Sequence, residues 1–282
     1  MLRDQTAALL MKYGISLEAA FDEQQLIDPW AIDALIEASG LKSDDTVIEI
    51  GPGAGNITVE LADKAAKVVA IEKNSKFNSI LKERLKGVGN VEVIEGDALK
   101  MRLPSFNILV SNLPYSIAEA VLQRLIKAKF KAASLITSSN FASILTATDY
   151  DPGYSKLTFE TQLYFDINKT LDVGSSSYYP EPKISTSIIT LKPREIKRPL
   201  EAVLRVLLLQ RDKKTRNALR EAFIASASLS YPSTKKDAMK VVTDLNLGPL
   251  LGKRVARLNL AELLLIRERL DHLPSQFVPN AV

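Results

Sequence analysis

The sequence contains no cysteine and only one histidine, His272, near the C-terminus. The lack of cysteine excludes a disulfide framework, a zinc site built on thiolates and a cysteine nucleophile. A single histidine argues against a Ser-His-Asp triad and against a cluster of histidine metal ligands. The chain has no hydrophobic run long enough to span a bilayer, and its N-terminus lacks the pattern of a secretory signal peptide. We therefore expect a cytoplasmic protein without a metal centre and without membrane association.

Positive charge is concentrated in the C-terminal part of the chain. The whole chain has a formal net charge of +4 at pH 7. Residues 199–282 hold 14 lysine and arginine residues against 8 aspartate and glutamate residues, whereas residues 1–198 hold 23 against 25. A basic part on a nearly neutral body is typical of a protein that binds nucleic acid, but a solvated helical surface has the same composition. Charge alone leaves both interpretations open.

Apolar runs alternate with segments of helical spacing over the first half of the chain. The apolar runs predict strands at residues 46–50, 67–72, 91–94, 107–110 and 134–137. The helical spacing predicts helices at residues 29–40, 57–66, 75–86 and 118–128. Strands that alternate with helices predict an α/β fold with a doubly wound, mostly parallel sheet.

The pattern changes after residue 150. Residues 157–167 and 184–191 form two long strand-like runs, which we expect to pair antiparallel at one edge of the sheet. Residues 192–199 have the composition of a linker, and from Leu200 onward the apolar residues fall at helical spacing. We therefore predict a first domain at residues 1–195, and a small, basic, all-α C-terminal domain at residues 196–282.

A glycine-rich turn joins the first predicted strand to the next helix. Its sequence, Gly51-Pro52-Gly53-Ala54-Gly55, lets backbone N–H groups approach a ligand closely. Glu72 ends the second strand, 21 residues after Gly51, where a carboxylate can accept both hydroxyl groups of a ribose. Asp97 follows the third strand. Because ligands of open α/β sheets bind at the carboxyl ends of the strands, these residues predict a cofactor site.

The residues around the turn distinguish between two cofactors that this layout could bind, NAD and S-adenosylmethionine. Asn56 stands where the dinucleotide fingerprint requires a third glycine, and no Gly-Lys-Ser/Thr follows for a P-loop. The neighbouring acids Glu49, Glu72, Glu95 and Asp97 would repel a pyrophosphate but attract a cationic sulfonium. Both features favour S-adenosylmethionine over NAD, and Asp97 can accept a hydrogen bond from the adenine amine.

Residues 112–115, Asn-Leu-Pro-Tyr, follow the fourth predicted strand. An adenine amine is a poor nucleophile because its lone pair is delocalised into the ring. If the Asn112 side-chain oxygen and the Leu113 or Pro114 carbonyl accept the two amine hydrogens, the lone pair turns toward a methyl donor. Pro114 has a fixed φ that helps to hold the backbone acceptor, and Tyr115 offers a face for stacking. Alignment can contribute about 7–11 kcal/mol, and the base must first be unstacked.

Five blocks of the sequence carry a family resemblance. They are Glu49–Gly55, Glu95–Ala98, Asn112–Ile117, Tyr179–Ile184 and Gln210–Leu219. They resemble, in order and over about residues 20–280, the ribosomal RNA small-subunit adenine dimethyltransferases of the kasugamycin-resistance methylase type. Each block is unspecific alone, but the set is specific. The resemblance implies a Rossmann-like class I methyltransferase fold. It also implies methylation, during ribosome biogenesis, of the 6-amino nitrogens of two adjacent adenines in a hairpin near the 3′ end of small-subunit rRNA.

The resemblance also implies roles for individual residues. Contacts with S-adenosylmethionine are implied for Gln24, Leu26, Gly51, Gly53, Glu72, Asp97, Ala98 and Asn112. The target amine would be framed by Asn112, Leu113, Pro114 and Tyr115. Phe141 matches a family aromatic that can stack on the target base. Residues 210–220 would lie against RNA, and we expect a monomer that binds small-subunit rRNA or the pre-ribosomal small subunit.

Two blocks depart from the family pattern. Residues 22–28 retain Leu26 and Asp28 but lack the glycine, glutamine and phenylalanine usual there. Residues 138–144 hold three serines in a block that usually carries glutamine, glutamate and arginine. Because these segments flank the cofactor and the base, three other functions stay open. They are a non-catalytic ribosome-assembly factor, a methyltransferase that acts on large-subunit RNA and, as the least supported, a dehydrogenase.

Overall fold

The computed structural model describes residues 1–17, 24–196, 198–226 and 234–273. The chain forms two compact units, Met1–Gly153 with Phe165–Pro193 and Tyr154–Tyr164 with Arg194–Val282. The chain crosses between the units three times, and the last crossing, after Pro193, lies close to the predicted division at residue 195. Residues 154–164 belong to the second unit although they come from the middle of the chain. None of the helices in the described ranges is long and apolar enough to cross a membrane.

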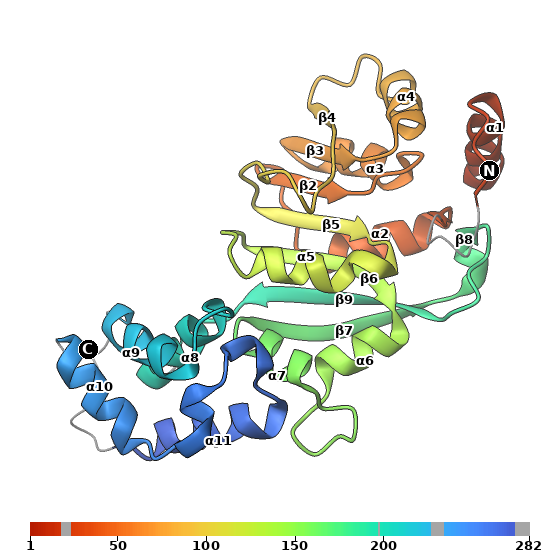
Figure 1. The fold of residues 1–282 in the computed structure, drawn as a ribbon. Helices are drawn as coiled ribbons and strands as arrows, with labels where there is room; N and C mark the ends of the chain where they lie inside the picture. The colour runs from red at the N-terminus through yellow and green to blue at the C-terminus, as the bar shows by residue number, and fades with distance from the viewer. Residues whose placement is uncertain (18–23, 197, 227–233, 274–282) are drawn as a thin grey trace. The chain divides into compact units, whose positions relative to one another are not determined.

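A seven-stranded sheet forms the centre of the first unit (Figure 1). The strands are β2 (Thr46–Ile50), β3 (Lys67–Glu72), β4 (Val91–Glu95), β5 (Ile108–Asn112), β6 (Ala132–Ser138), β7 (Phe165–Val173) and β9 (Thr186–Pro193). Their order is β4-β3-β2-β5-β6-β9-β7, and the first five are parallel. The predicted doubly wound, mostly parallel sheet is confirmed. The strand order reverses between β2 and β5, and ligands of such sheets bind at this reversal.

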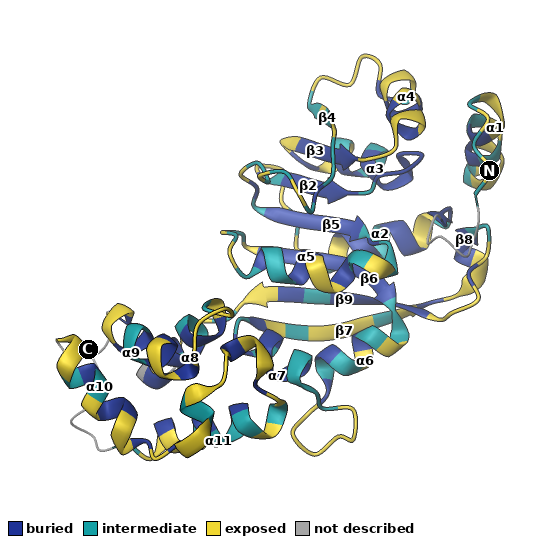
Figure 2. Cartoon of the chain, viewed as in Figure 1, coloured by how far each residue is buried: buried dark blue, intermediate teal, exposed yellow. Residues whose placement is uncertain are grey.

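Helices cover the faces of the sheet, as parallel strands require. The first unit contains α1 (Leu2–Lys12), α2 (Pro29–Ala38), α3 (Asn56–Lys64), α4 (Ser75–Arg84), α5 (Ala118–Leu125) and α6 (Ser139–Thr146), with a 3₁₀ turn at Tyr115–Ile117 and another at Ser175–Ser177. Four of these confirm the predicted helices, with ends that differ by a few residues. The parallel strands β2, β3, β5 and β6 are largely buried (Figure 2), and Val47, Ile48 and Leu109 are fully enclosed.

The strand predicted over residues 157–167 is wrong except for its last three residues, since β7 begins at Phe165. Residues Lys156–Gln162 form the helix α7. The preceding residue, Ser155, is its N-cap, because its side chain accepts a hydrogen bond from the Thr158 N–H. Phe159 and Leu163 are four residues apart, and both pack in the core of the second unit, as one face of a helix does. The antiparallel pair at the sheet edge is confirmed, because β7 pairs with β9 and β9 with β6.

A small second sheet, which the sequence did not predict, brings the N-terminal segment to the main sheet. Gln25 and Leu26 form β1, which pairs antiparallel with β8 (Tyr178–Tyr179). Tyr178 is buried, and its hydroxyl lies 2.7 Å from the Thr186 Oγ1 of β9. The pairing fixes residues 24–26 beside the glycine turn.

The second unit is helical throughout its described part. It consists of α7, α8 (Pro199–Leu209), α9 (Thr215–Ala225), α10 (Lys235–Asp244) and α11 (Leu260–Asp271), with 3₁₀ turns at Gly248–Gly252 and Val255–Arg257. Buried and exposed residues alternate around α9 and α10 in the pattern of amphipathic helices (Figure 2). The predicted all-α character of this region is confirmed.

Candidate active site

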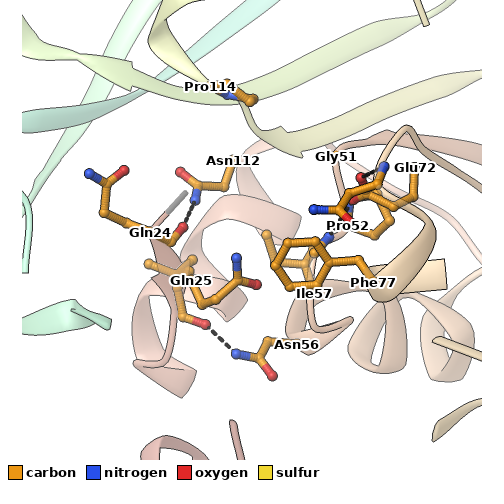
Figure 3. A pocket seen from close by; sticks show the side chains of 13 residues that line it. Gln24, Gln25, Gly51, Pro52, Asn56, Ile57, Glu72, Phe77, Asn112 and Pro114 are labelled. Carbon is orange, nitrogen blue, oxygen red and sulfur yellow. Dashed lines mark hydrogen bonds between the residues drawn. The ribbon is translucent and has the colours of Figure 1, made fainter. Parts of the chain in front are cut away.

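A cavity lies at the carboxyl ends of β2, β3 and β5 (Figure 3). Six residues that the sequence predicted as cofactor contacts line it, namely Gln24, Leu26, Gly51, Gly53, Glu72 and Asn112. Pro114, predicted to frame the target amine, lines it as well. The cavity therefore joins the predicted cofactor contacts to the start of the Asn-Leu-Pro-Tyr segment.

The glycine turn packs against β1. Gly53 has φ +55°, in the left-handed region that favours glycine. A Cβ atom at Gly53 would lie 2.3 Å from the Gln25 Oε1, so no larger residue fits without moving Gln25. The turn is thus shaped by its own backbone and by the side chain that packs on it.

Glu72 is held against the glycine turn by two backbone groups. Its Oε2 accepts the Gly53 N–H at 3.1 Å, and its Oε1 accepts the Asn74 N–H at 2.8 Å. The side chain lies at the end of β3, and the residue is only 7% exposed. Because a carboxylate oxygen can accept more than one hydrogen bond, the oriented carboxylate keeps the capacity to bind a diol.

Asn112 ends β5 and has one of its two polar atoms engaged. Its Nδ2 donates to the Gln24 carbonyl at 3.2 Å (Figure 3). Its Oδ1 is buried and has no hydrogen-bond partner among the described residues. A buried acceptor without a donor costs about 1–3 kcal/mol, so this atom is suited to a donor from a ligand.

The rest of the Asn-Leu-Pro-Tyr segment turns away from the strand. Leu113 is buried in the core, and its N–H donates to the Ile136 carbonyl. The Pro114 carbonyl accepts the Ile117 N–H at 3.1 Å, which closes the 3₁₀ turn that contains Tyr115. Leu113 and Tyr115 are not among the residues that line the cavity.

Three other predicted site residues lie outside the cavity lining. The Asp97 Oδ1 accepts the Leu99 N–H at 2.9 Å, and Oδ2 lies 3.4 Å from the Lys73 ammonium. The backbone bond, with the lysine charge, holds the pKa of Asp97 below its ordinary value, so its carboxylate stays ionised. Ala98 is buried beside it, and Phe141 is half-buried in the first turn of α6.

The serines of the departing block at residues 138–144 bond within the protein. Ser138 is the N-cap of α6, and its hydroxyl accepts a hydrogen bond from the Phe141 N–H. The Ser139 and Ser187 hydroxyls lie 2.7 Å apart, and Ser187 donates to Asp172. These serines therefore stabilise the start of α6 and its junction with β9.

Glu49 is a buried carboxyl group behind the glycine turn. It is 1% exposed, and its Oε2 accepts the Thr58 hydroxyl at 2.6 Å. Its Oε1 has no hydrogen-bond partner in the described part of the chain. Burial raises the pKa of Glu49 from its ordinary value of 4.5 to about 8, although the hydrogen bond from Thr58 lowers it. Near neutral pH this side chain therefore holds a proton.

Six residues that line the cavity were missed from the sequence, namely Gln25, Pro52, Asn56, Ile57, Asn74 and Phe77. The Asn56 Nδ2 donates to the Leu26 carbonyl at 2.7 Å, Gln25 contacts the glycine turn, and Phe77 comes from α4. Asn56 was noted only as the residue that replaces a third glycine. Gln25 stands between two predicted contacts, and nothing in the local pattern distinguishes it.

Comparison with known proteins finds one matching family and several similar chains. The model of the family described as "Ribosomal RNA adenine dimethylase" matches residues 16–246. The "Probable ribosomal RNA small subunit methyltransferase A" of Methanothermobacter thermautotrophicus is 37% identical over 79% of this chain and 82% of its own length. The protein of the same name from Methanosarcina barkeri is 33% identical over 97% and 94%.

Two solved structures are similar over most of the chain. A dimethyladenosine transferase from Plasmodium falciparum has a TM-score of 0.60 and 28% identity, covering 86% of this chain and 96% of its own. The 23S rRNA methyltransferase ErmE has a TM-score of 0.60 and 26% identity, covering 88% and 99%. The similarity therefore extends over both units of the chain.

Proposed function

We propose that this chain, which belongs to the ribosomal RNA adenine dimethylase family, dimethylates two adjacent adenines in the 3′-terminal hairpin of small-subunit rRNA. The family membership makes it an rRNA adenine N-methyltransferase that uses S-adenosylmethionine. The choice of the small subunit is supported by relatives at 33% and 37% identity that are named for it. We also propose that it acts as a monomer in the cytoplasm, during ribosome biogenesis.

The unpaired Oδ1 of Asn112 is the observation that carries this proposal. An acceptor at the end of β5 can take one hydrogen of the target amine. Because the Asn112 Nδ2 donates to the Gln24 carbonyl, the oxygen end of the amide is the end left for the substrate. The Pro114 carbonyl is engaged in the following turn, so we favour the Leu113 carbonyl as the second acceptor.

The cofactor contacts fit the charge and shape of S-adenosylmethionine. When bound, this cofactor supplies a methyl group on a sulfonium centre. We propose that the Glu72 carboxylate, oriented by the Gly53 and Asn74 N–H groups, accepts the ribose hydroxyls. Asp97 is proposed to accept from the adenine amine, and its lowered pKa keeps it an acceptor at neutral pH. Glu72, whose carboxylate lines the cavity, suits a cationic cofactor.

The basic segment at residues 210–220 is proposed to bind the RNA backbone. Lys214 and Arg216 are exposed at the start of α9 in the second unit. An isolated bridge pairs Lys214 with Arg254, so two basic segments lie side by side there. Lysine and arginine clusters of this kind bind phosphates without reading sequence.

The three alternative functions differ in how well they are supported. The family match leaves no support for a dehydrogenase. The likeness to a 23S rRNA methyltransferase keeps large-subunit RNA as the second candidate substrate, at the lower identity of 26%. A purely binding role is disfavoured because the Asn112 acceptor is retained.

The proposal is tested by incubating the purified protein with S-adenosylmethionine and unmethylated small or large ribosomal subunits in parallel. Mass spectrometry of digested rRNA then identifies the modified nucleosides, and a reaction without cofactor is the control. Dimethyladenosine from the small subunit supports the proposal. Monomethyladenosine alone would limit it to one transfer, and modification of the large subunit alone would replace it with the second candidate.

A further inference from the structure

Residues 24–26, which include strand β1, contact both parts of the candidate site. The Gln24 carbonyl accepts from Asn112, and the Leu26 carbonyl accepts from Asn56 (Figure 3). Between them, the Gln25 side chain accepts from the backbone of the glycine turn. Two of these bonds use backbone carbonyls of residues 24–26, so only the central bond depends on which side chain this segment carries.

The Gln25 contact is a buried bond to the turn itself. Its Oε1 accepts the Ala54 N–H at 2.8 Å, and the residue is 9% exposed. Its amide group lies against Gly53, where the Oε1, Nε2 and Cδ atoms are 2.3–2.9 Å from the place a Cβ would occupy. The Gln25 amide group can therefore lie here only because residue 53 is a glycine, and no larger residue fits at position 53 while Gln25 keeps this position.

Two consecutive N–H groups of the turn are thus fixed by side chains from different elements. Glu72 of β3 accepts the Gly53 N–H, and Gln25 of β1 accepts the Ala54 N–H. Without the glutamine oxygen the Ala54 N–H would be buried without a partner, and the turn would shift to find one. A shift of Gly53 would also move the donor that orients the Glu72 carboxylate.

We propose that Gln25 is a positioning residue that holds the glycine turn, and through it Glu72, in the conformation that binds the cofactor. The inference rests on the proposed function of this site. Gln25 acts on the cofactor side, because its bond ends at the turn and not at Asn112. The expected consequence is a change in cofactor affinity with little change in RNA binding or in the rate at saturating cofactor.

The test replaces Gln25 with two residues of similar length. Methionine in Gln25→Met removes the acceptor, and the carboxylate in Gln25→Glu restores it. We expect Gln25→Met to raise the Kd and the KM for S-adenosylmethionine about tenfold, with kcat and the KM for the small subunit nearly unchanged. Gln25→Glu should recover most of the affinity. Gln5→Met, at an exposed glutamine of α1, is the matched control.

Isothermal titration calorimetry with S-adenosylmethionine, together with methyl-transfer kinetics, separates the outcomes. Unchanged affinity in Gln25→Met overturns the positioning role. Equal losses in both variants, or parallel losses in kcat and RNA binding, also overturn it, because they indicate general damage to the fold. If the wild-type protein neither binds the cofactor nor methylates rRNA, the proposed function itself fails, and that result needs no variant.

Discussion

The two halves of the candidate site differ in whether the polar groups at the cavity have partners within the chain. On the cofactor side, the Gly53 and Ala54 N–H groups are bonded to Glu72 and Gln25. On the base side, the Asn112 Oδ1 is buried and has no partner among the described residues. The cofactor half is therefore preorganised by the protein, whereas the base half is left for the substrate to complete.

The largest effect is expected where the base half presents its acceptor. Replacing Asn112 with alanine removes the oxygen proposed to accept the amine hydrogen. We expect kcat to fall about 10²- to 10³-fold, the range found when one preorganised hydrogen-bonding group is removed from an active site. The KM values for S-adenosylmethionine and for the small subunit should change only a few-fold. Methyl-transfer kinetics and calorimetry measure the two effects separately.

Asn168→Ala is the matched control for this experiment. Asn168 is exposed on the edge strand β7, far from β5 in the strand order. It should retain wild-type turnover. Normal turnover in Asn112→Ala would contradict the proposed mechanism and remove the distinction between the two halves.

A smaller, pH-dependent effect is expected behind the cofactor half, at Glu49. Because the folded pKa is about 8 and the ordinary value is 4.5, folded Glu49 keeps its proton where the unfolded chain has lost it. The stabilisation is complete below pH 4.5 and is lost as the pH rises to about 8. Glu49→Gln lacks this dependence, so its stability relative to wild type should increase with pH, by up to about 1.4 kcal/mol per unit. Urea unfolding at pH 5, 6.5 and 8 measures the difference.

An exposed glutamate serves as the reference for that experiment. Glu92 pairs with Lys67 at the surface, and both side chains are about half exposed. The stability difference between Glu92→Gln and wild type should stay nearly constant over the same range. A constant difference for Glu49→Gln as well would mean that Glu49 is ionised in the folded protein.

The features predicted correctly from the sequence are those encoded within a few neighbouring residues. The strands ending at Ile50 and Glu72 are short apolar runs next to turn residues. The glycine turn between the first of them and α3 can be recognised directly from its glycine residues. The helix α7 was misread because Leu157, Phe159, Thr161 and Leu163 also alternate with more polar residues, as in a strand. The segment is a helix because Phe159 and Leu163 pack against helices that are distant in the sequence.

The contacts of the site that were missed join distant parts of the chain. The Gln25–Ala54 bond spans 29 residues, and the Asn112–Gln24 bond spans 88. Such bonds depend on the pairing of β1 with β8, which two-residue strands do not reveal by periodicity. The resemblance to a family identified Gln24 and Leu26, but it was silent at Gln25, where the chain departs from the usual pattern.

The smallest expected effect concerns Thr137, whose buried hydroxyl also has no partner among the described residues. Thr137 is the penultimate residue of β6 and follows Ile136, which pairs with Asn112 of β5. Valine has nearly the same shape, so Thr137→Val removes only the buried hydroxyl. If no substrate group uses it, thermal unfolding should show stability within about 1 kcal/mol of wild type, and methyl transfer should be unchanged. Thr170→Val, exposed on β7, is the control. A loss of turnover in Thr137→Val alone would show that the base half offers the substrate a second polar contact, which sharpens its difference from the cofactor half.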